Sequence, residues 1–428
     1  MLSVAVAAEL PRIALRTLGC KVNRTESEAL AEALAGVCSV VMDSDECADV
    51  VVINTCTVTG EADAKARKAV RHALSGGAGA VLVTGCLAAI DPQGLQALDP
   101  RIVVETDRAA LPRRVAQLAG ADLDAHAPVD VMSGALGRTR VMVKVQDGCS
   151  HRCSYCIVPD ARGLPRSVPA AEVVARVETL ARAGTPEVVL TGVNIGRYAD
   201  PAGAPDLAAL VDAVTATPIG RVRLSSIEPL DLDERLLAAL SGSPKTVPHL
   251  HVPLQSGCDR TLGAMGRGYD SERFAEVLRT ARAAVPGLSV TTDVIAGFPG
   301  ETEADFAESL AFVERMGFTR VHVFRYSPRA GTPAAARSDQ VAPAVKAARA
   351  RSLRELSQRL LLGHARARIG TEVTACIERV CGDVARGTAD DSLSVEVPAA
   401  GLLRGQVVRV RIDGGDEQGY RGTVLESS

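Results

Sequence analysis

The sequence predicts an α/β protein in three parts: an open parallel α/β domain, a partial (β/α)6 barrel and a small β-barrel. In the first two parts, short apolar runs alternate with stretches of helical periodicity. In the last part, short strands are separated by glycine-rich turns. Strands that alternate with helices indicate parallel sheets, whereas consecutive strands indicate an all-β module. We expect these domains at residues 11–120, 135–365 and 368–428.

Cysteines follow the strands of the first domain. The strands expected at Ile13–Leu18, Val50–Asn54 and Ala80–Thr84 precede Cys20, Cys56 and Cys86. A single cysteine in such a place is commonly buried filler. The carboxyl ends of parallel strands meet at one edge of the sheet, however, so three cysteines in the same place are expected to converge. We interpret these three cysteines as ligands of an iron–sulfur cluster. Five other cysteines show no such placement and are interpreted as structural: Cys38, Cys47, Cys258, Cys376 and Cys381.

The second domain follows a weakly patterned connector at about 106–138. The strands expected in it are Val141–Val145, Glu187–Leu190, Arg221–Ser225, His249–Leu254, Ser289–Ile295 and Arg320–Phe324. Helical patterns follow most of these strands, for example at Ala170–Ala183 and Ala304–Met316. Six β/α units are too few for an eight-fold barrel, which predicts an open barrel with its mouth at the carboxyl ends of the strands.

A trio of cysteines, Cys149, Cys153 and Cys156, lies just after the first strand of this barrel. A structural zinc site takes four protein ligands, and His151 has little room in the short loop to serve as the fourth. An iron–sulfur cluster held by three cysteines keeps one iron open, and S-adenosylmethionine (SAM) is the ligand we expect there. Zinc binding is the alternative interpretation.

Candidate SAM contacts lie at the expected barrel mouth. They are Tyr155, whose ring is placed to lie against the adenine, and Thr191, Gly192, Asn194, Glu228, Gln255 and Asp293. For each residue after Tyr155, the alternative is a turn or packing role. Arg162 is a candidate partner for either the SAM carboxylate or an RNA phosphate, and the sequence does not choose between them.

Composition excludes several classes of protein. The chain has 428 residues, 47% of them hydrophobic, and a net charge of -3, so its bulk charge predicts no polyanionic partner. Eleven cysteines in a chain of this length do not indicate a disulfide framework. Oxygen-sensitive clusters need a reducing compartment, so we expect a cytoplasmic location. No signal peptide and no apolar run of about 18 residues is evident, so we expect no membrane association.

A basic helix is expected at residues 344–369. Its cations are Lys346, Arg349, Arg351, Arg354, Arg359, Arg366 and Arg368. Such a helix is commonly a solvated face, but it also suits a surface that follows RNA phosphates. Residues 370–428 hold six arginines and ten acidic residues, a composition that makes a poor RNA platform by itself. This composition weakens the case that the small β-barrel alone binds RNA and raises the importance of the basic helix, but the sequence does not say which of the two dominates.

Taken together, these stretches resemble the radical-SAM methylthiotransferases from about Ile13 to the C-terminus. The resemblance is carried by TLGCKVNRTES, INTCTVTGEADAKARKAVR, VTGCLA and QDGCSHRCSYCIVPDARGLPRS, with later matches such as HVPLQSG, DVIAGFPGET and YSPRAGTPA. It implies an N-terminal domain with a three-cysteine auxiliary cluster, a partial-barrel radical-SAM domain and a C-terminal TRAM β-barrel.

The first motif indicates a branch of this family. GCKVN is similar to the branch that modifies threonylcarbamoyladenosine at tRNA position 37, whereas the isopentenyladenosine branch usually has GCQMN and the ribosomal-protein branch GCPKN. NTCTVT and IVPDARG favour the same branch. Two departures are Arg24-Thr25-Glu26, where Gln-Tyr-Glu is usual, and the scarcity of aromatic residues after Gly387-Thr388.

The resemblance implies a transferase of sulfur-containing groups (EC 2.8.4.-), a tRNA (N6-L-threonylcarbamoyladenosine(37)-C2)-methylthiotransferase. It would use two 4Fe–4S clusters and SAM, one cluster to make a carbon radical and the other to carry sulfur. A radical suits the purine C2–H bond, which acid–base catalysis does not activate sufficiently. Expected partners are the anticodon loop of tRNA, an electron donor such as flavodoxin or ferredoxin, and a sulfur donor.

The alternatives within the family are methylthiolation of isopentenyladenosine in tRNA or of a ribosomal-protein aspartate. Outside the family, they are an iron–sulfur electron carrier with an RNA-binding tail and a zinc-binding RNA module.

Overall fold

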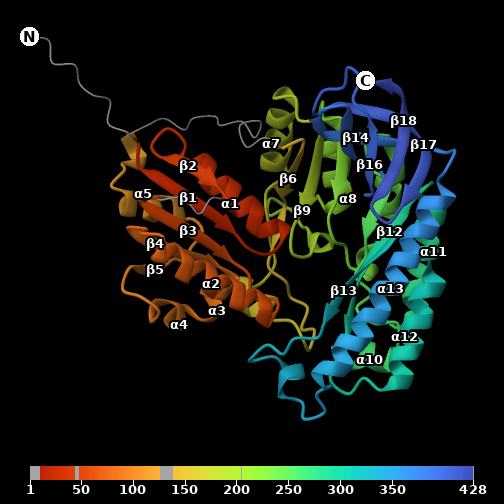
Figure 1. Ribbon diagram of the computed structural model, residues 1–428, viewed down its shortest axis with the longest axis horizontal. Helices are drawn as coiled ribbons and strands as arrows, with labels where there is room; N and C mark the ends of the chain where they lie inside the picture. Colours follow the sequence, from red (N-terminus) through yellow and green to blue (C-terminus); the bar gives the residue numbers. More distant parts are fainter. Residues whose placement is uncertain (1–9, 44–47, 126–137, 204, 428) are drawn as a thin grey trace, which may run out of the picture. The chain divides into compact units, whose positions relative to one another are not determined.

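The computed structural model describes residues 10–43, 48–125, 138–203 and 205–427, which form two compact units (Figure 1). The first unit holds the described residues up to 125 together with the segment Ile157–Gly163. The second unit holds the other described residues, and so contains both the partial barrel and the small β-barrel. None of the helices in these described ranges is both long enough and apolar enough to cross a membrane.

The first unit is built on a five-stranded parallel sheet with the order β2-β1-β3-β4-β5. Its strands are β1 (Arg12–Thr17), β2 (Ser39–Met42), β3 (Val50–Thr55), β4 (Ala80–Gly85) and β5 (Ile102–Val104). The central strand β3 is buried on both faces, as its unbroken apolar run predicts. The edge strands β2 and β5 escaped prediction because they are short and only partly buried.

Helices cover both faces of this sheet. They are α1 (Lys21–Leu34), α2 (Gly60–Ser75), α3 (Cys86–Ile90), α4 (Pro92–Gln96), α5 (Leu111–Ala119) and α6 (Val158–Arg162), with a 3-10 turn at Leu123–Ala125. Alternate strand residues face opposite layers: Leu15 packs with α1 and α5, whereas Ile53 packs with α2 and α3. Helix α5 corrects the expectation of an irregular connector, because Pro112 and Gly120 bracket a short amphipathic helix. Residues 126–137 of that connector lie outside the described residues.

The second unit contains the partial barrel. Its strands are β6 (Arg140–Lys144), β9 (Glu187–Thr191), β10 (Arg221–Leu224), β11 (His249–His251), β12 (Ser289–Ala296) and β13 (Arg320–Arg325). They form two parallel sheets, β10-β9-β6 and β11-β12-β13, joined by isolated parallel bridges such as Ser226↔His251. Strand β11 is shorter than predicted, since Pro253 lacks an N–H group and Gln255 adopts a left-handed conformation with φ of 71°. The predicted six-stranded open barrel is otherwise confirmed.

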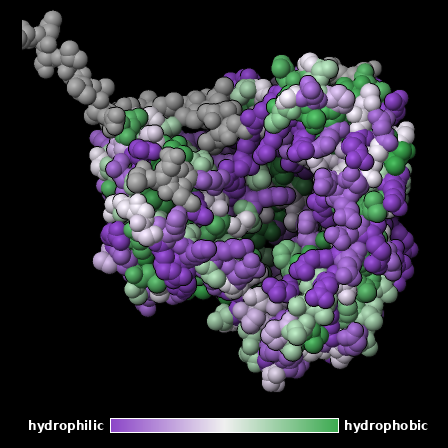
Figure 2. Space-filling model, viewed as in Figure 1, coloured by the Kyte–Doolittle hydropathy of each residue, from purple (hydrophilic) through white to green (hydrophobic). Residues whose placement is uncertain are grey.

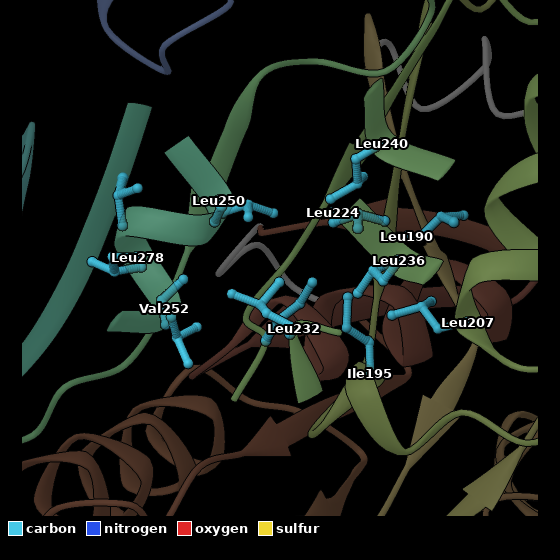
Figure 3. Packing of buried hydrophobic residues seen from close by; sticks show 14 of the residues in the cluster. Leu190, Ile195, Leu207, Leu224, Leu232, Leu236, Leu240, Leu250, Val252 and Leu278 are labelled. Atoms are coloured by element: carbon cyan, nitrogen blue, oxygen red, sulfur yellow. The ribbon is translucent and has the colours of Figure 1, made fainter. Parts of the chain in front are cut away.

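Helices pack on the outer side of the barrel strands. They are α7 (Ala170–Arg182), α8 (Leu207–Ala216), α9 (Glu234–Gly242), α10 (Asp259–Met265), α11 (Ser271–Ala284) and α12 (Glu303–Met316). Leucines from strands and helices form the shared core between them, including Leu190, Leu224, Leu236 and Leu278 (Figure 3). Between β6 and α7 in the chain, β7 (Gln146–Asp147) and β8 (Arg166–Ser167) pair as a short antiparallel ribbon.

The long helix α13 (Pro343–Ala367) packs on β13 and leads into a closed five-stranded barrel (Figure 1). The strands of this barrel are β14 (Glu372–Cys381), β15 (Val384–Ala389), β16 (Ser394–Pro398), β17 (Val407–Asp416) and β18 (Gly419–Ser427). Apolar residues such as Val395 and Val410 fill the interior. The predicted small β-barrel is confirmed.

A buried charge cluster ties the two barrels of the second unit together. The Glu187 carboxylate, which is fully buried, accepts bonds from Arg221 at 3.0 Å and from Arg223 at 2.9 Å. Arg223 also donates to the Ser392 hydroxyl at 2.6 Å and to the Ala389 carbonyl at 3.2 Å, both in the small β-barrel. Burial raises the pKa of Glu187, but the two guanidinium groups outweigh that effect and hold the pKa below its usual value.

Replacing Arg223 by leucine is therefore expected to destabilise the second unit by about 3–5 kcal/mol, because it removes half of the charge that compensates Glu187. The change is measured as a fall in the thermal unfolding temperature. The destabilisation should shrink as the pH falls through the folded pKa of Glu187, because protonation removes the charge that Arg223 stabilises.

The matched control is Arg386→Ala, which breaks an exposed ion pair with Glu396 worth at most about 1 kcal/mol. Equal destabilisation by the two variants would show that the buried cluster does not hold the barrels together.

Candidate functional site

The first unit brings Cys20, Cys56 and Cys86 together at one edge of its sheet. They follow β1, β3 and β4, which are neighbours in the sheet. Gly19 has φ of 107°, and a Cβ added to it would lie 2.5 Å from the Cβ of Cys56. The loop that carries Cys20 therefore approaches Cys56 so closely that only glycine fits before Cys20. Three thiols widely separated in the sequence thus share one site.

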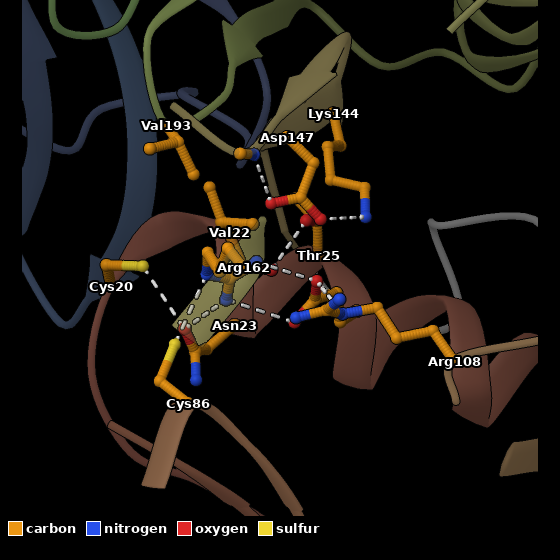
Figure 4. A network of polar contacts seen from close by, with 12 residues as sticks. Cys20, Val22, Asn23, Thr25, Cys86, Arg108, Lys144, Asp147, Arg162 and Val193 are labelled. Atoms are coloured by element: carbon orange, nitrogen blue, oxygen red, sulfur yellow. Dashed lines mark hydrogen bonds and ion pairs between the residues drawn. The ribbon is translucent and has the colours of Figure 1, made fainter. Parts of the chain in front are cut away.

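A buried arginine lies against this site (Figure 4). The Arg162 side chain, 2% exposed, donates from Nε to Cys86 Sγ at 3.2 Å and from Nη2 to Asn23 Oδ1 at 2.9 Å. Asn23 Oδ1 also accepts from the Cys20 thiol at 3.2 Å. Asn23 therefore connects the cation to a second cysteine. From the sequence, the expected partner of Arg162 was either a SAM carboxylate or an RNA phosphate. In the described structure, Arg162 instead contacts residues of the cysteine site.

One acidic residue, Glu26, completes the network. Glu26 accepts from Arg162 at 3.0 Å and from Arg108 at 2.7 Å, so one carboxylate lies between two guanidinium groups. Glu26 belongs to the Arg24-Thr25-Glu26 segment, and its ion pairs give that segment a structural role beside the cysteines.

Burial at this site opposes the formation of thiolates, and Arg162 offsets part of that effect. Burial raises the pKa of Cys86 to about 11, and the charge of Arg162 opposes that rise. Burial likewise raises the pKa of Cys56. Metals are bound by thiolates, so a site of buried thiols gains from a metal that stabilises their deprotonated form and from the nearby guanidinium. Three soft sulfur ligands with an N–H donor fit an iron–sulfur cluster.

Arg162→Gln is expected to shift the reduction potential of a cluster in this site to a more negative value. The positive charge of Arg162 and its hydrogen bond to sulfur both favour the reduced cluster, and the substitution removes both of them. The measurement is an EPR-monitored redox titration of anaerobically reconstituted protein.

Arg162→Lys, which keeps the charge, is the matched variant and should shift the potential less. An unchanged potential in Arg162→Gln, with full iron content, would contradict this electrostatic role.

The second unit carries Cys149, Cys153 and Cys156 on a loop that is anchored at its centre. The Ser154 N–H donates to the Met265 carbonyl at 2.9 Å, and its hydroxyl donates to the Ala264 carbonyl at 2.8 Å. Both carbonyls lie at the end of α10. The Cys156 N–H donates to the Cys153 carbonyl at 3.0 Å and closes the turn between these cysteines. The end of α10 thus fixes the loop after β6.

Positive charge is also buried beside this trio. Arg267, whose side chain is 3% exposed, donates to Cys153 Sγ at 3.3 Å and pairs with Glu228. Burial raises the pKa of Cys153, but hydrogen bonding from His151 and the charge of Arg267 outweigh it and lower the pKa below its usual value. The structure thus gives His151 a role toward Cys153 that the sequence did not predict. Glu228, predicted to contact the SAM ribose, is a partner of Arg267.

Two buried hydroxyls lie at the carboxyl ends of neighbouring barrel strands. Thr191 Oγ1, at the end of β9, and Ser225 Oγ, just after β10, have no hydrogen-bond partner among the described residues. Buried polar groups are normally paired, so these hydroxyls fit a polar ligand at the barrel mouth. The two polar atoms of the Asn194 side chain are also buried and have no hydrogen-bond partner among the described residues, and this side chain lowers the pKa of nearby Cys149 against the larger effect of burial.

The other predicted SAM residues have distinct surroundings. A Cβ on Gly192 would lie 2.7 Å from the Gln146 carbonyl oxygen, so close packing requires this glycine. Gln255 has a positive φ, a conformation that costs a non-glycine residue energy and that concentrates at functional sites. Tyr155 packs on the apolar cluster of Met265 and Phe298.

Asp293 Oδ1 lies 3.2 Å from His251 Nε2, on the inner face of the sheet. Asp293 therefore has a histidine neighbour, His251, that the sequence did not predict.

Asn23, Ser225 and Arg267 escaped prediction as site residues. None of them belongs to a regular spacing pattern, and Arg267 lies more than one hundred positions after the cysteine that it contacts. The position of Ser225 would have been enough to indicate it as a site residue, because it ends a predicted strand at the barrel mouth.

Two family models match the chain. The radical SAM superfamily matches residues 143–313, and a family described as uncharacterized protein family UPF0004 matches residues 12–105. The first match covers the loop of Cys149 and most of the partial barrel. The second covers the three strands that precede Cys20, Cys56 and Cys86.

Curated relatives match over most of the chain. "Threonylcarbamoyladenosine tRNA methylthiotransferase MtaB" of Bacillus subtilis is 39% identical over 81% of this chain and 80% of the relative. The protein of the same name from Chlamydia pneumoniae is 35% identical over 95% of this chain and 97% of the relative. "tRNA-2-methylthio-N(6)-dimethylallyladenosine synthase" of Bordetella petrii is 34% identical over 98% and 92%.

Solved structures agree in fold. The radical S-adenosylmethionine methyltransferase TsrM from Kitasatospora setae superposes with a TM-score of 0.56 at 16% identity, over 76% of this chain and 77% of TsrM. The open barrel and its three-cysteine loop define a radical-SAM protein. The chain belongs to the radical-SAM methylthiotransferase family, in the branch of its threonylcarbamoyladenosine tRNA methylthiotransferase relatives.

Proposed function

We propose that this protein adds a methylthio group to C2 of N6-threonylcarbamoyladenosine at position 37 of tRNA. The observation that carries the proposal is the pair of three-cysteine sites, each at the carboxyl edge of a parallel sheet, in a chain 35–39% identical to relatives with that name. A carrier of electrons needs neither the polar barrel mouth nor a second three-cysteine site.

The second unit would hold the first 4Fe–4S cluster and SAM. Cys149, Cys153 and Cys156 would ligate three irons, while Arg267 supports the thiolate of Cys153. With SAM bound, this cluster would supply the carbon-radical chemistry that the C2–H bond of the purine requires.

The polar groups of the barrel mouth would orient SAM. Thr191, Gly192, Asn194 and Ser225 suit its methionine part, and Glu228, Gln255 and Tyr155 suit its nucleoside part. Asp293 stays a candidate contact on the inner wall of the barrel.

The first unit would hold the second 4Fe–4S cluster, which carries the sulfur to be transferred. Cys20, Cys56 and Cys86 would be its ligands. Arg162 would hold the Cys86 sulfur in place through the hydrogen bond that it donates, whereas the bond that Asn23 accepts from the Cys20 thiol is lost when that thiol gives up its proton to bind iron. Glu26 fixes Arg162 in turn, so the guanidinium needs no reorganisation when a cluster binds.

Replacing Cys20, Cys56 and Cys86 by alanine is expected to abolish methylthiolation while SAM cleavage to 5′-deoxyadenosine continues. The iron content should fall by half, because one of two clusters is absent. A strain lacking the gene, complemented with each variant, is analysed by mass spectrometry of tRNA nucleosides.

Cys38→Ala, a buried cysteine of the same unit away from the sheet edge, is the control and should restore the modification. A methylthio mark that persists in the triple variant would refute the sulfur-carrying role. Loss of methylthio-isopentenyladenosine, or of a modified ribosomal aspartate, would assign the chain to another branch of the family.

The RNA-binding surface would include the exposed face of α13. The structure corrects the expectation that all of its cations are available, because Arg349 is buried and paired with Glu301 at 2.8 Å. Lys346 lies 4.8 Å over the ring of Tyr326. The cations left on the exposed face are Arg351, Arg354, Arg359 and Arg366. Figure 2 shows this side of α13 as largely hydrophilic.

Replacing Arg351 and Arg354 by alanine is expected to weaken tRNA binding. The slope of log affinity against log salt should fall by about 0.7–0.9 for each phosphate that the variant no longer neutralises. Fluorescence anisotropy with labelled tRNA over a range of salt concentrations measures both quantities.

Alanine at Arg409 and Arg411 in the small β-barrel is the comparison, because these cations pair with Glu372 and Asp413. A larger fall in affinity from the β-barrel pair would reverse the assignment.

The reaction also needs electrons and sulfur. A flavodoxin- or ferredoxin-type donor would supply the electrons, and a separate sulfur donor would replenish the second cluster. The cytoplasm, which is reducing and contains tRNA, is the compartment that suits both clusters.

A further inference from the structure

Three potential metal ligands project from adjacent strands on the inner face of the partial barrel. His251 lies on β11, Asp293 on β12 and His322 on β13. In the parallel register, Asp293 lies directly opposite His322, and His251 lies opposite Thr291, two residues before Asp293. Residues two apart on a strand share a face, so all three side chains point to the same side of the sheet. The opposite face carries Val290 and Val294, which belong to the apolar core.

The distances between these side chains suit one ion. The ligand atoms of the three residues lie within 4.8 Å of one another, and His251 Nε2 lies 3.2 Å from Asp293 Oδ1. Ligand atoms around a first-row metal with bonds of about 2.1 Å are spaced by about 3–3.5 Å. The nearer pair already has that spacing, and a small rotation of the side chains would bring the third atom to it.

Thr291 is placed to orient the His251 ring as a metal ligand. Its Oγ1 lies 3.0 Å from His251 Nδ1 and 3.2 Å from His249 Nε2. When the threonine hydroxyl accepts from His251 Nδ1–H, the lone pair of His251 is at Nε2, which faces Asp293. A metal-binding histidine commonly has its other nitrogen oriented in this way by a second residue. In that tautomer the Nε2 lone pair and the carboxylate oxygen repel each other unless a metal ion or a proton lies between them.

We propose that His251, Asp293 and His322 form a binding site for a divalent first-row metal ion, separate from both iron–sulfur clusters. Two imidazoles and one carboxylate are ligands for zinc, iron, cobalt or manganese ions. Three protein ligands leave positions open, as in catalytic rather than structural metal sites. The His322 side chain is on an exposed residue, so the open positions are accessible to a ligand.

The charge of the loaded site indicates what it binds. A divalent ion with one carboxylate and two neutral imidazoles has a net charge of about +1, which attracts an anionic oxygen ligand. If the proposed function holds, the substrate base carries the carboxylate of its threonyl group. This inference rests on that function, and it makes the metal the group that distinguishes threonylcarbamoyladenosine from an adenosine without a carboxylate.

Metal binding is tested first, without tRNA. Reconstituted holoprotein with both clusters is dialysed against zinc, and zinc and iron are measured by mass spectrometry. We expect one zinc per chain beyond the clusters, unchanged iron, and loss of that zinc in His322→Ala and Asp293→Asn. His72→Ala, which removes an exposed imidazole of α2, should keep it.

X-ray absorption at the zinc edge provides an independent readout. Nitrogen and oxygen neighbours at about 2.0–2.1 Å are expected, whereas sulfur neighbours at about 2.3 Å would place the zinc on cluster cysteines. Sulfur neighbours, no bound zinc, or equal zinc in wild type and both site variants would overturn the proposal and leave a simple His–Asp ion pair.

The ligand is tested with two tRNAs that differ only in the threonylcarbamoyl group. Zinc should strengthen binding of the modified tRNA by about tenfold, as expected for a charge-assisted contact, and leave binding of the unmodified tRNA unchanged. His322→Ala should abolish this difference. Equal effects of zinc on both tRNAs would overturn the carboxylate assignment. If the deletion strain keeps its methylthio mark, the proposed function is refuted. If zinc binding by the protein still depends on His322 in that case, the metal site is nevertheless supported.

Discussion

The geometry of parallel strands is the constraint on which both cysteine sites depend. In the first unit, β1, β3 and β4 are adjacent, and each ends just before a cysteine, so hydrogen-bond register alone brings the three thiols to one edge. In the second unit, the loop after β6 carries all three cysteines, and α10 holds it at the carboxyl edge of the barrel. One site is assembled from distant segments and the other from a single short loop.

Each site then meets the same electrostatic problem, because burial disfavours a thiolate. Each site has a buried arginine that opposes this effect: Arg162 offsets it only in part at Cys86, whereas Arg267, together with His151, outweighs it at Cys153. Each arginine is in turn paired with a carboxylate, Glu26 or Glu228, which fixes the guanidinium in place. A cation held in this way stabilises sulfur ligands without reorganisation, and also favours the reduced, more negatively charged form of a bound cluster.

The sequence predicted what local periodicity and motif spacing determine. The barrel strands, the closed C-terminal module and the cysteine motifs are visible within short windows, because each window contains the apolar pattern or the ligands themselves. The short edge strands β2 and β5 were missed because they bury few residues. Arg267 was missed as a site residue because its role arises only when distant strands and helices pack, whereas Ser225 was missed although its position at the end of a predicted strand placed it at the barrel mouth. Arg349 was counted as a free cation because helical spacing does not reveal the carboxylate of Glu301.

The inner wall of the partial barrel shows how the same strands serve two purposes. Residues that face outward, such as Val290 and Val294, supply the apolar core, whereas the alternate residues Thr291 and Asp293 present polar side chains to the inner face. In a closed eight-stranded barrel those positions are filled with branched apolar side chains. Here His251, Asp293 and His322 occupy them, and the contacts of His251 with Asp293 and Thr291 pair polar groups that would otherwise cost stability. A polar inner wall of this kind also suits a bound cation and an anionic substrate group.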